Sequence, residues 1–218
     1  MIKANNLVKN FGKTAALNDL SLQIESGKVL AIMGPSGSGK STLLHCLAGI
    51  ILPDSGEVYY EDTRITSLND TERTLLRRSE FGFIFQFSQL VPELSALDNA
   101  AVPLLLSGMK LKDAQEKAQA ALAAVDLAGK EYSLPGQLSG GEAQRVALAR
   151  VLTYEPRVIF ADEPTGSLDS YNSERVMELL VAQARNRHIT VVLVTHEPLI
   201  AAYADNEVVV RDGKLVNA

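Results

Sequence analysis

The sequence has one cysteine and no long apolar run, and each absence excludes a class of protein. Cys46 stands alone among 218 residues, so no internal disulfide forms, which suits a reducing compartment. We expect its thiol to pack in the core. No apolar run approaches the roughly 20 residues that span a bilayer, so at a membrane another chain must supply the span. The first residues, "MIKANNLVKNFGK", lack the apolar centre of a signal peptide.

A surplus of basic residues is also missing. Lysine and arginine number 21 against 26 aspartates and glutamates, for a net charge of −5. Such a balance argues against a broad nucleic-acid surface, which needs clustered Lys and Arg, so we expect no nucleic-acid partner. Repeats, low-complexity tracts and coiled-coil heptads are absent too. With 46% hydrophobic residues, the chain can bury a core of one domain, or one core with an insertion.

The order of predicted elements favours an α/β fold. "LSLQI", "VLAIMG" and "EVYYEDTRI" are typical of strands, and "STLLHCLAGI" is typical of a helix. From about Ser88 to Pro135, strong helix formers such as "DAQEKAQAALAAVDLAG" indicate a helical insertion. Helices and strands then alternate through "EAQRVALARVLTY", "VIFAD", "NSERVMELLVAQARN" and "ITVVLVT", and "EVVVRDGKLV" predicts a hairpin on an Asp-Gly turn. Such alternation is typical of a mainly parallel sheet.

The glycine-rich stretch "GPSGSGKST" carries the strongest chemical signal. It matches G-x-x-x-x-G-K-[ST] between a predicted strand and a predicted helix, which is the context of a phosphate-binding loop. Backbone N–H groups would surround phosphate oxygens, Lys40 would place its charge at the β- and γ-phosphates, and Ser41 would ligate Mg²⁺. A plain glycine-rich turn is the alternative. The candidate ATP-binding residues are Gly34, Pro35, Ser36, Gly37, Ser38, Gly39, Lys40, Ser41 and Thr42.

The stretch "VIFADE" supplies two carboxylates at the end of an apolar strand. Asp162 would hold Mg²⁺ directly or through water, and Glu163 would polarise the attacking water as general base. An acidic pair at a strand end is common and says little alone. Together with a phosphate loop it indicates nucleotide hydrolysis.

The stretch "LSGGEAQR" predicts a second helix start that suits an anion. Ser139 and two glycines precede "VALARVL", and the N–H groups at a helix N-terminus attract negative charge. A single nucleotide cannot occupy two distant phosphate sites on one subunit. Ser139 is therefore either an ordinary N-cap or a contact to a nucleotide held elsewhere. As a mere cap, this helix start would tolerate a side chain at Gly141.

The motifs "GPSGSGKST", "LSGGEAQR", "VIFADE", "SLD" and "TH", in that order, resemble the nucleotide-binding domain of ABC transporters over almost the whole chain. In that family two domains pair head to tail, and each nucleotide lies between the phosphate loop of one subunit and the signature helix of the other. The resemblance therefore implies a homodimer on ATP binding. The residues implied in the partner's ATP site are Ser139, Gly140, Gly141, Glu142 and Asp169; for Ser167 or Asp169 an N-cap role is the alternative.

The same resemblance assigns roles to three further side chains. Phe11 stands where the family has an aromatic residue, more often Tyr, that stacks on adenine; a core position is the alternative. Gln86 matches the glutamine that reaches Mg²⁺ and the attacking water, and His196 matches the switch histidine at the γ-phosphate. The implied catalytic residues are Lys40, Gln86, Glu163 and His196, and the implied metal ligands are Ser41, Gln86 and Asp162.

The resemblance also implies the architecture and the place of work. It predicts an α/β fold, with a P-loop NTPase (RecA-like) core around a mainly parallel sheet, an N-terminal antiparallel β subdomain and an inserted α-helical subdomain. Residues 1–218 would form a single ABC ATPase domain, with the helical subdomain in 88–135 and the remainder in 1–87 and 136–218. The insertion would dock on an integral-membrane permease subunit, at the cytoplasmic face of the cell membrane. Between Gln86 and Asn99, the candidate contacts are Leu90, Val91, Leu94 and Leu97, or else these residues pack within the subdomain.

Two further stretches indicate a branch of the family. "LVPELSALDNAAVPLL" and "ADEPTGSLDS" look most like the small ATPases of the lipoprotein-release, macrolide-efflux and heme-efflux group, which work with a separate or fused four-helix membrane subunit. The implied function is ATP binding and hydrolysis in an efflux or extraction system. An importer is one alternative. Another is a soluble ABC-type ATPase acting on nucleic acid or ribosomes, but those relatives carry two cores or a long coiled coil, which this chain lacks.

Overall fold

The computed structural model describes residues 2–216, and its elements largely follow the predicted order. The strands are β1 (Ile2–Phe11), β2 (Thr14–Ile24), β3 (Val29–Met33), β4 (Ser55–Tyr60), β5 (Thr63–Arg64), β6 (Phe81–Phe85), β7 (Val158–Asp162), β8 (Thr190–Val194), β9 (Asn206–Arg211) and β10 (Lys214–Val216). The helices are α1 (Lys40–Leu47), α2 (Asp70–Glu80), α3 (Ala96–Leu106), α4 (Leu111–Ala123), α5 (Gly140–Leu152), α6 (Ser170–Asn186) and α7 (Pro198–Ala201), with short 3-10 helices at Ile65–Ser67 and Pro135–Gln137.

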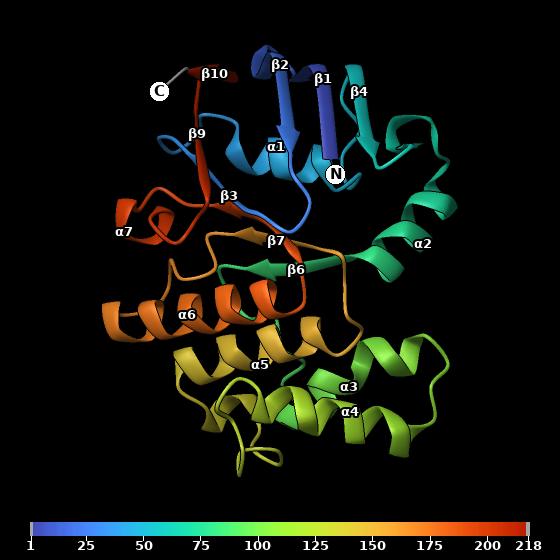
Figure 1. Ribbon diagram of the computed structural model, residues 1–218, viewed down its shortest axis with the longest axis vertical. Coiled ribbons are helices and arrows are strands. Elements are labelled where there is room, and N and C mark those ends of the chain that lie inside the picture. The colour runs from blue at the N-terminus through green and yellow to red at the C-terminus, as the bar shows by residue number, and fades with distance from the viewer. Residues whose placement is uncertain (1, 217–218) are drawn as a thin grey trace.

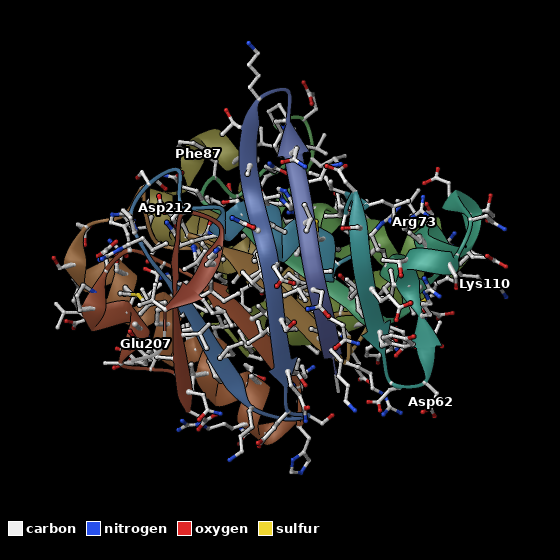
Figure 2. All side chains as sticks on the ribbon, turned by 90° about the horizontal axis from the view of Figure 1, so that it is seen from above. Asp62, Arg73, Phe87, Lys110, Glu207 and Asp212 are labelled. Atoms are coloured by element: carbon white, nitrogen blue, oxygen red, sulfur yellow. The ribbon has the colours of Figure 1, made fainter. Side chains whose placement is uncertain are left out.

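These elements form layers, which Figure 1 shows from an antiparallel sheet at the top to α3 and α4 at the bottom. The upper sheet has the order β2-β1-β4-β5, and Figure 2 looks down on it, with α2 and its labelled Arg73 to one side. Helix α1 lies beneath, on a six-stranded sheet in the order β10-β9-β3-β8-β7-β6. In this larger sheet only β10 is antiparallel to its neighbour; the other pairings are parallel. Helices α5 and α6 cover its other face.

Both faces of the six-stranded sheet are buried, because successive side chains of a strand point to opposite sides. In β8, Val192 and Val194 join the apolar cluster formed with α1 and the upper sheet, whereas Val191 and Leu193 join the cluster formed with α5 and α6. Cys46 of α1 lies in the first cluster and is 1% exposed, as expected of a packing residue. Burial raises the pKa of its thiol to about 12.

Helices α3 and α4, which lie in the predicted insertion, share a core with α5. Ala100 of α3 and Leu122 of α4 belong to the same apolar cluster as Leu148 of α5. That cluster continues through α6 to the larger sheet, so α3 and α4 share one continuous apolar interior with α5, α6 and this sheet. Within residues 2–216, no helix is both long enough and apolar enough to cross a bilayer.

Helix α2 is the element that apolar periodicity does not predict. None of its residues is fully buried, because Leu75 and Leu76 are its only apolar residues, and Leu76 packs partly against the apolar cluster beneath the upper sheet. Its N-terminus instead carries a capping box: Glu72 N–H donates to Asn69 Oδ1 at 3.0 Å, and Asn69 N–H donates to Glu72 Oε2 at 2.8 Å. The spacing of "NDTE" was therefore the usable signal for this helix.

Candidate functional site

The phosphate loop joins β3 to α1 and lies tightly against both sheets. Gly34 has a φ of 145° and Gly39 a φ of 105°, a region that side chains disfavour. A Cβ on Gly34 would lie 2.1 Å from the carbonyl oxygen of Val210 in β9. A Cβ on Gly39 would lie 2.2 Å from the carbonyl oxygen of Ala16 in β2. Both glycines are therefore required by the way the loop is enclosed.

The hairpin of β9 and β10 braces this loop. Gly213, in the predicted Asp-Gly turn, donates its N–H to the carbonyl oxygen of Ser38 at 3.0 Å. Its own carbonyl oxygen accepts from the N–H of Asn18 in β2 at 2.9 Å. Figure 2 shows the neighbouring Asp212 beside the upper sheet. The turn thus ties the loop to β2.

Lys40 begins α1 and lies inside the loop. It is 5% exposed, and its Nζ donates to the carbonyl oxygens of Gly34 at 2.8 Å and Pro35 at 2.9 Å. The Ser38 hydroxyl is buried, and within the described residues it has no hydrogen-bond partner. A loop with an enclosed ammonium, an unpaired hydroxyl and a helix N-terminus suits phosphate oxygens, which accept hydrogen bonds from all three.

Ser41 and Asp162 bring two oxygen atoms together beside the loop. The Ser41 hydroxyl donates to Asp162 Oδ1 at 3.0 Å. Burial raises the pKa of the Asp162 carboxyl, and the hydrogen bond from Ser41 acts against this. Oxygen donors fit Mg²⁺, which usually binds one or two protein groups and takes its other ligands from phosphate and water. Residues 2–216 contain no group of three or more His, Cys, Asp or Glu side chains arranged to hold a metal ion.

Gln86 and Glu163 follow directly after neighbouring strands. Strands β6 and β7 pair Phe85 with Asp162, so both loops leave the sheet at the same edge. A Cβ on Gly166 would lie 3.1 Å from Gln86 Nε2 and 3.4 Å from Glu163 Oε2, so both side chains end beside the same backbone. The two polar groups therefore meet where the phosphate loop, also at a strand's carboxyl end, opens.

Glu163 is held in an unusual conformation by its setting. Its φ is 47°, an uncommon value for a residue with a side chain, and such values gather at functional sites. Its Oε1 lies 3.1 Å from His196 Nδ1, which joins the predicted general base to the predicted switch histidine. A cleft of about 430 Å³ opens here, and its lining residues are Ser36, Gly37, Lys40, Ser41, Phe85, Gln86, Phe87, Gln89, Asp162 and Glu163.

Ser139 is the N-cap of α5, as one of the two interpretations predicts. Its Oγ accepts from the Glu142 N–H at 3.2 Å, and its N–H donates to Glu142 Oε2 at 2.8 Å. Lys130 Nζ lies 3.1 Å from Glu142 Oε1. The Ser139 N–H and Lys130 hold the pKa of Glu142 below its usual range. The carboxylate of Glu142 thus already has partners within its own subunit.

The helix start nevertheless remains open to solvent. Ser139 and Gly140 are exposed, and Ser139 lies on a groove of about 810 Å³. None of the residues lining this groove also lines the phosphate cleft. One subunit therefore carries the phosphate cleft and, apart from it, an exposed helix N-terminus that its own cap leaves accessible.

The expectation that a simple cap would tolerate a side chain at Gly141 is wrong. A Cβ there would lie 2.3 Å from Asn172 Oδ1 and 2.9 Å from Asn172 Cβ, closer than real Cβ contacts. Asn172 is itself tied down, because its Nδ2 donates to Asp169 Oδ2 at 2.7 Å. A side chain at this position therefore fits only if Asn172 moves away from the start of α5.

Three other predicted residues have definite places. Phe11 is 51% exposed at the end of β1, so the alternative of a core position is wrong. Asp169 caps α6 by accepting from the Asn172 N–H at 2.9 Å, which lowers the pKa of its carboxyl. Ser167 is no cap, because its hydroxyl donates to the carbonyl oxygen of Gln86 at 2.9 Å.

Two residues of α5 to which the sequence analysis assigned no role hold the segment around Gln86: Gln144, within the stretch "LSGGEAQR", and Arg150, which follows it. Gln144 is 2% exposed, and its Nε2 donates to the carbonyl oxygen of Phe85. Arg150 donates to the carbonyl oxygens of Ser88 and Gln89, each at 2.9 Å. A signal for Gln144 existed: it is a polar residue at helical spacing with the buried face of α5.

Comparison with known proteins agrees with this geometry. A family model described as ABC transporter matches residues 17–166. The lipoprotein-releasing system ATP-binding protein LolD of Hyphomonas neptunium is 41% identical over 206 residues, which cover 94% of this chain and 90% of that protein. The macrolide export ATP-binding/permease protein MacB of Chromobacterium violaceum is 46% identical over 204 residues, which cover 94% of this chain and 32% of MacB.

A solved structure shows the same fold. The dimeric, post-hydrolysis state of the ATP-binding cassette MJ0796, bound to ADP and Pi, superimposes with a TM-score of 0.90 at 37% identity. The match covers 100% of this chain and 97% of the cassette. The predicted α/β P-loop NTPase fold is confirmed.

Proposed function

The chain belongs to the ABC transporter family as an ATP-binding and ATP-hydrolysing subunit, and from this membership we propose that it drives an efflux or extraction system through a separate integral-membrane subunit. The names of two relatives support transport away from the cytoplasm or the membrane, since one is called a lipoprotein-releasing protein and the other a macrolide export protein. The observation that carries the proposal is the exposed N-terminus of α5, which lies apart from the phosphate cleft of the same subunit.

In the cleft, the phosphate loop and Lys40 bind and orient the phosphates of ATP. Ser41, Asp162 and Gln86 would hold Mg²⁺ beside the phosphates, and the metal would offset the negative charge of the phosphates. Glu163 takes the proton of the attacking water as general base. His196 orients the Glu163 carboxylate through the 3.1 Å contact between its Nδ1 and Glu163 Oε1. It also contacts the γ-phosphate of the bound ATP. Phe11, exposed at the end of β1, offers a face for adenine.

The second position serves a nucleotide held by another copy of the chain. Two copies related head to tail would place Ser139, Gly140 and Gly141 of each against the ATP in the other's cleft, with Glu142 and Asp169 beside them. The proposal agrees with the exposure of this helix start and with the dimeric state named for the structurally similar cassette. ATP then acts as the contact between the two subunits.

The membrane subunit docks on the helical subdomain, which we assign to residues 88–135. Within the candidate segment, Val91 is 42% exposed, whereas Leu97 is 7% exposed. Leu90 packs partly against the apolar cluster. Of the four apolar residues predicted to dock, Val91 is therefore the most exposed, Leu90 and Leu94 are half-buried, and Leu97 serves the interior. Such docking would keep the protein in the cytoplasm, at the inner face of the cell membrane.

The partner-site assignment is tested by two substitutions that differ only in charge. Both Asn and Asp are good N-cap residues, so Ser139→Asn and Ser139→Asp keep the cap of α5. Unit charges 4 Å apart repel by about 4 kcal/mol at an effective dielectric constant of about 20. In a Glu163→Gln background, where ATP is retained, we expect the Asn variant to dimerise with ATP and the Asp variant to dimerise at least 100-fold more weakly.

Light scattering with and without ATP measures dimerisation, and thermal unfolding without ATP confirms that both variants fold alike. Binding of ATP to the monomer should be equal in the two, because the loop around Lys40 is unchanged. Equal ATP-dependent dimerisation of both variants would leave Ser139 as a helix cap alone.

A further inference from the structure

Gln144 connects the start of α5 with both loops that carry the predicted water-binding residues. Its Nε2 donates to the carbonyl oxygen of Phe85 at 2.7 Å and to that of Pro164 at 2.8 Å. Phe85 immediately precedes Gln86, and Pro164 immediately follows Glu163. One buried amide nitrogen thus holds the backbone next to both residues.

The chemistry of this position requires a primary amide of this length. The Nε2 atom has two N–H groups, and each satisfies one carbonyl oxygen. A carboxylate would place negative charge against two carbonyl oxygens, and an apolar side chain would leave both acceptors without their partner. The same helix holds the segment at a second point, where Arg150 donates to the carbonyl oxygens of Ser88 and Gln89.

We propose that Gln144 is a positioning residue that makes the placement of Gln86 and Glu163 depend on the position of the α5 N-terminus. Gln144 lies little more than one helical turn after Ser139, so a rigid shift of the helix start carries its amide along. Contact between this helix start and the partner's nucleotide would then change the positions of Gln86 and Glu163 in the subunit's own cleft. This proposal rests on the proposed function, because it requires that the cleft hydrolyses ATP and that the α5 N-terminus contacts the ATP of the partner subunit.

The test compares Gln144→Met with Thr153→Val. The first removes both N–H donors at similar side-chain volume. The second removes another buried hydrogen bond of α5, from Thr153 Oγ1 to the carbonyl oxygen of Arg150 at 2.8 Å, at the far end of the helix. Steady-state ATP hydrolysis gives kcat and KM, and hydrogen exchange of the backbone amides reports on residues 85–89 and 163–167. All assays run well below the unfolding midpoint of each variant.

For Gln144→Met we expect kcat to fall at least tenfold, with KM for ATP within twofold, because the loop around Lys40 is intact. Exchange should rise at least tenfold in both segments. Thr153→Val should show neither effect at a comparable loss of thermal stability. If Gln144→Met does not fold, Gln144→Asn replaces it, since its amide is one methylene too short to reach both carbonyl oxygens, and the same outcomes apply.

The proposal is overturned if kcat of the Gln144 variant stays within twofold of wild type, if KM rises in step with the loss of kcat, or if exchange in the two segments is unchanged. A failure of the proposed function would look different. In that case wild-type protein would show no ATP-dependent dimer or no hydrolysis, and the exchange measurement alone would decide whether Gln144 positions the loops.

Discussion

Replacing Gly141 by alanine should destabilise the chain through Asn172, with no nucleotide involved. Helix propensity by itself favours alanine over glycine by up to about 1 kcal/mol. Against this gain, the new Cβ would lie 2.3 Å from Asn172 Oδ1 and 2.6 Å from its Cγ. Forcing extra atoms into a packed contact costs about 1–3 kcal/mol. Rotation of Asn172 would break its bond to Asp169 Oδ2. We therefore expect a net loss of about 1–2 kcal/mol.

A double-mutant cycle with Asn172→Ala isolates the contact. Asn172→Ala alone loses one exposed hydrogen bond and should cost less than about 1 kcal/mol. The double variant should be more stable than the sum of the single effects by at least about 1 kcal/mol, as expected of residues in contact. Urea unfolding without ATP, followed by circular dichroism, measures all four free energies.

Two results would refute this reasoning: a Gly141→Ala protein as stable as wild type, or single effects that add within about 0.3 kcal/mol. If the steric account holds, loss of function at Gly141 does not by itself demonstrate contact with a partner's nucleotide. Ser139, which is exposed and tolerates other capping residues, is the better position for that question.

Two further predictions concern the chemistry and the docking surface. Glu163→Gln should bind ATP but hydrolyse it at least 100-fold more slowly, since general-base catalysis contributes typically 10²–10⁴-fold. Near-normal hydrolysis by Glu163→Gln would contradict the assignment of Glu163 as the base. Lys40→Ala should instead weaken nucleotide binding itself. Val91→Asp, at an exposed position, should reduce co-purification with the membrane subunit from detergent extracts while ATPase activity of the isolated protein stays measurable. Leu97→Asp, at a buried position, should instead lower the unfolding temperature, and undisturbed assembly and transport with Val91→Asp would contradict the docking surface.

Much of this architecture could be predicted because local sequence and local structure agree. The continuous apolar strand "VLAIM", the loop around Lys40 and the Asp-Gly turn each carry their own signal, and the structure places them where the patterns indicate. Helix α2 was not predicted because it has only two apolar residues, Leu75 and Leu76, which are too few to show helical periodicity; its capping box is the signal that marks it.

Contacts between distant segments could not be predicted from the sequence. Gly141 meets Asn172, and Gln144 meets both Phe85 and Pro164, only after α5 has packed on α6 and the larger sheet. Motif spacing gives the identity of such residues but not their neighbours. The exposure of Phe11 and the 3.1 Å contact between Glu163 and His196 likewise depend on tertiary packing.

The bracing of the phosphate loop by the β9–β10 hairpin has a consequence for the order of synthesis. Strand β3, which leads into the loop, pairs on one side with β8 and on the other with β9. The loop itself is closed by Val210 and by the Gly213 N–H. A ribosome makes the loop early, but Val210 and Gly213 must also have left the exit tunnel before the loop is enclosed. A growing chain therefore gains its ATP site only after the β9–β10 hairpin has been made, and a chain terminated before this hairpin leaves the loop unsupported.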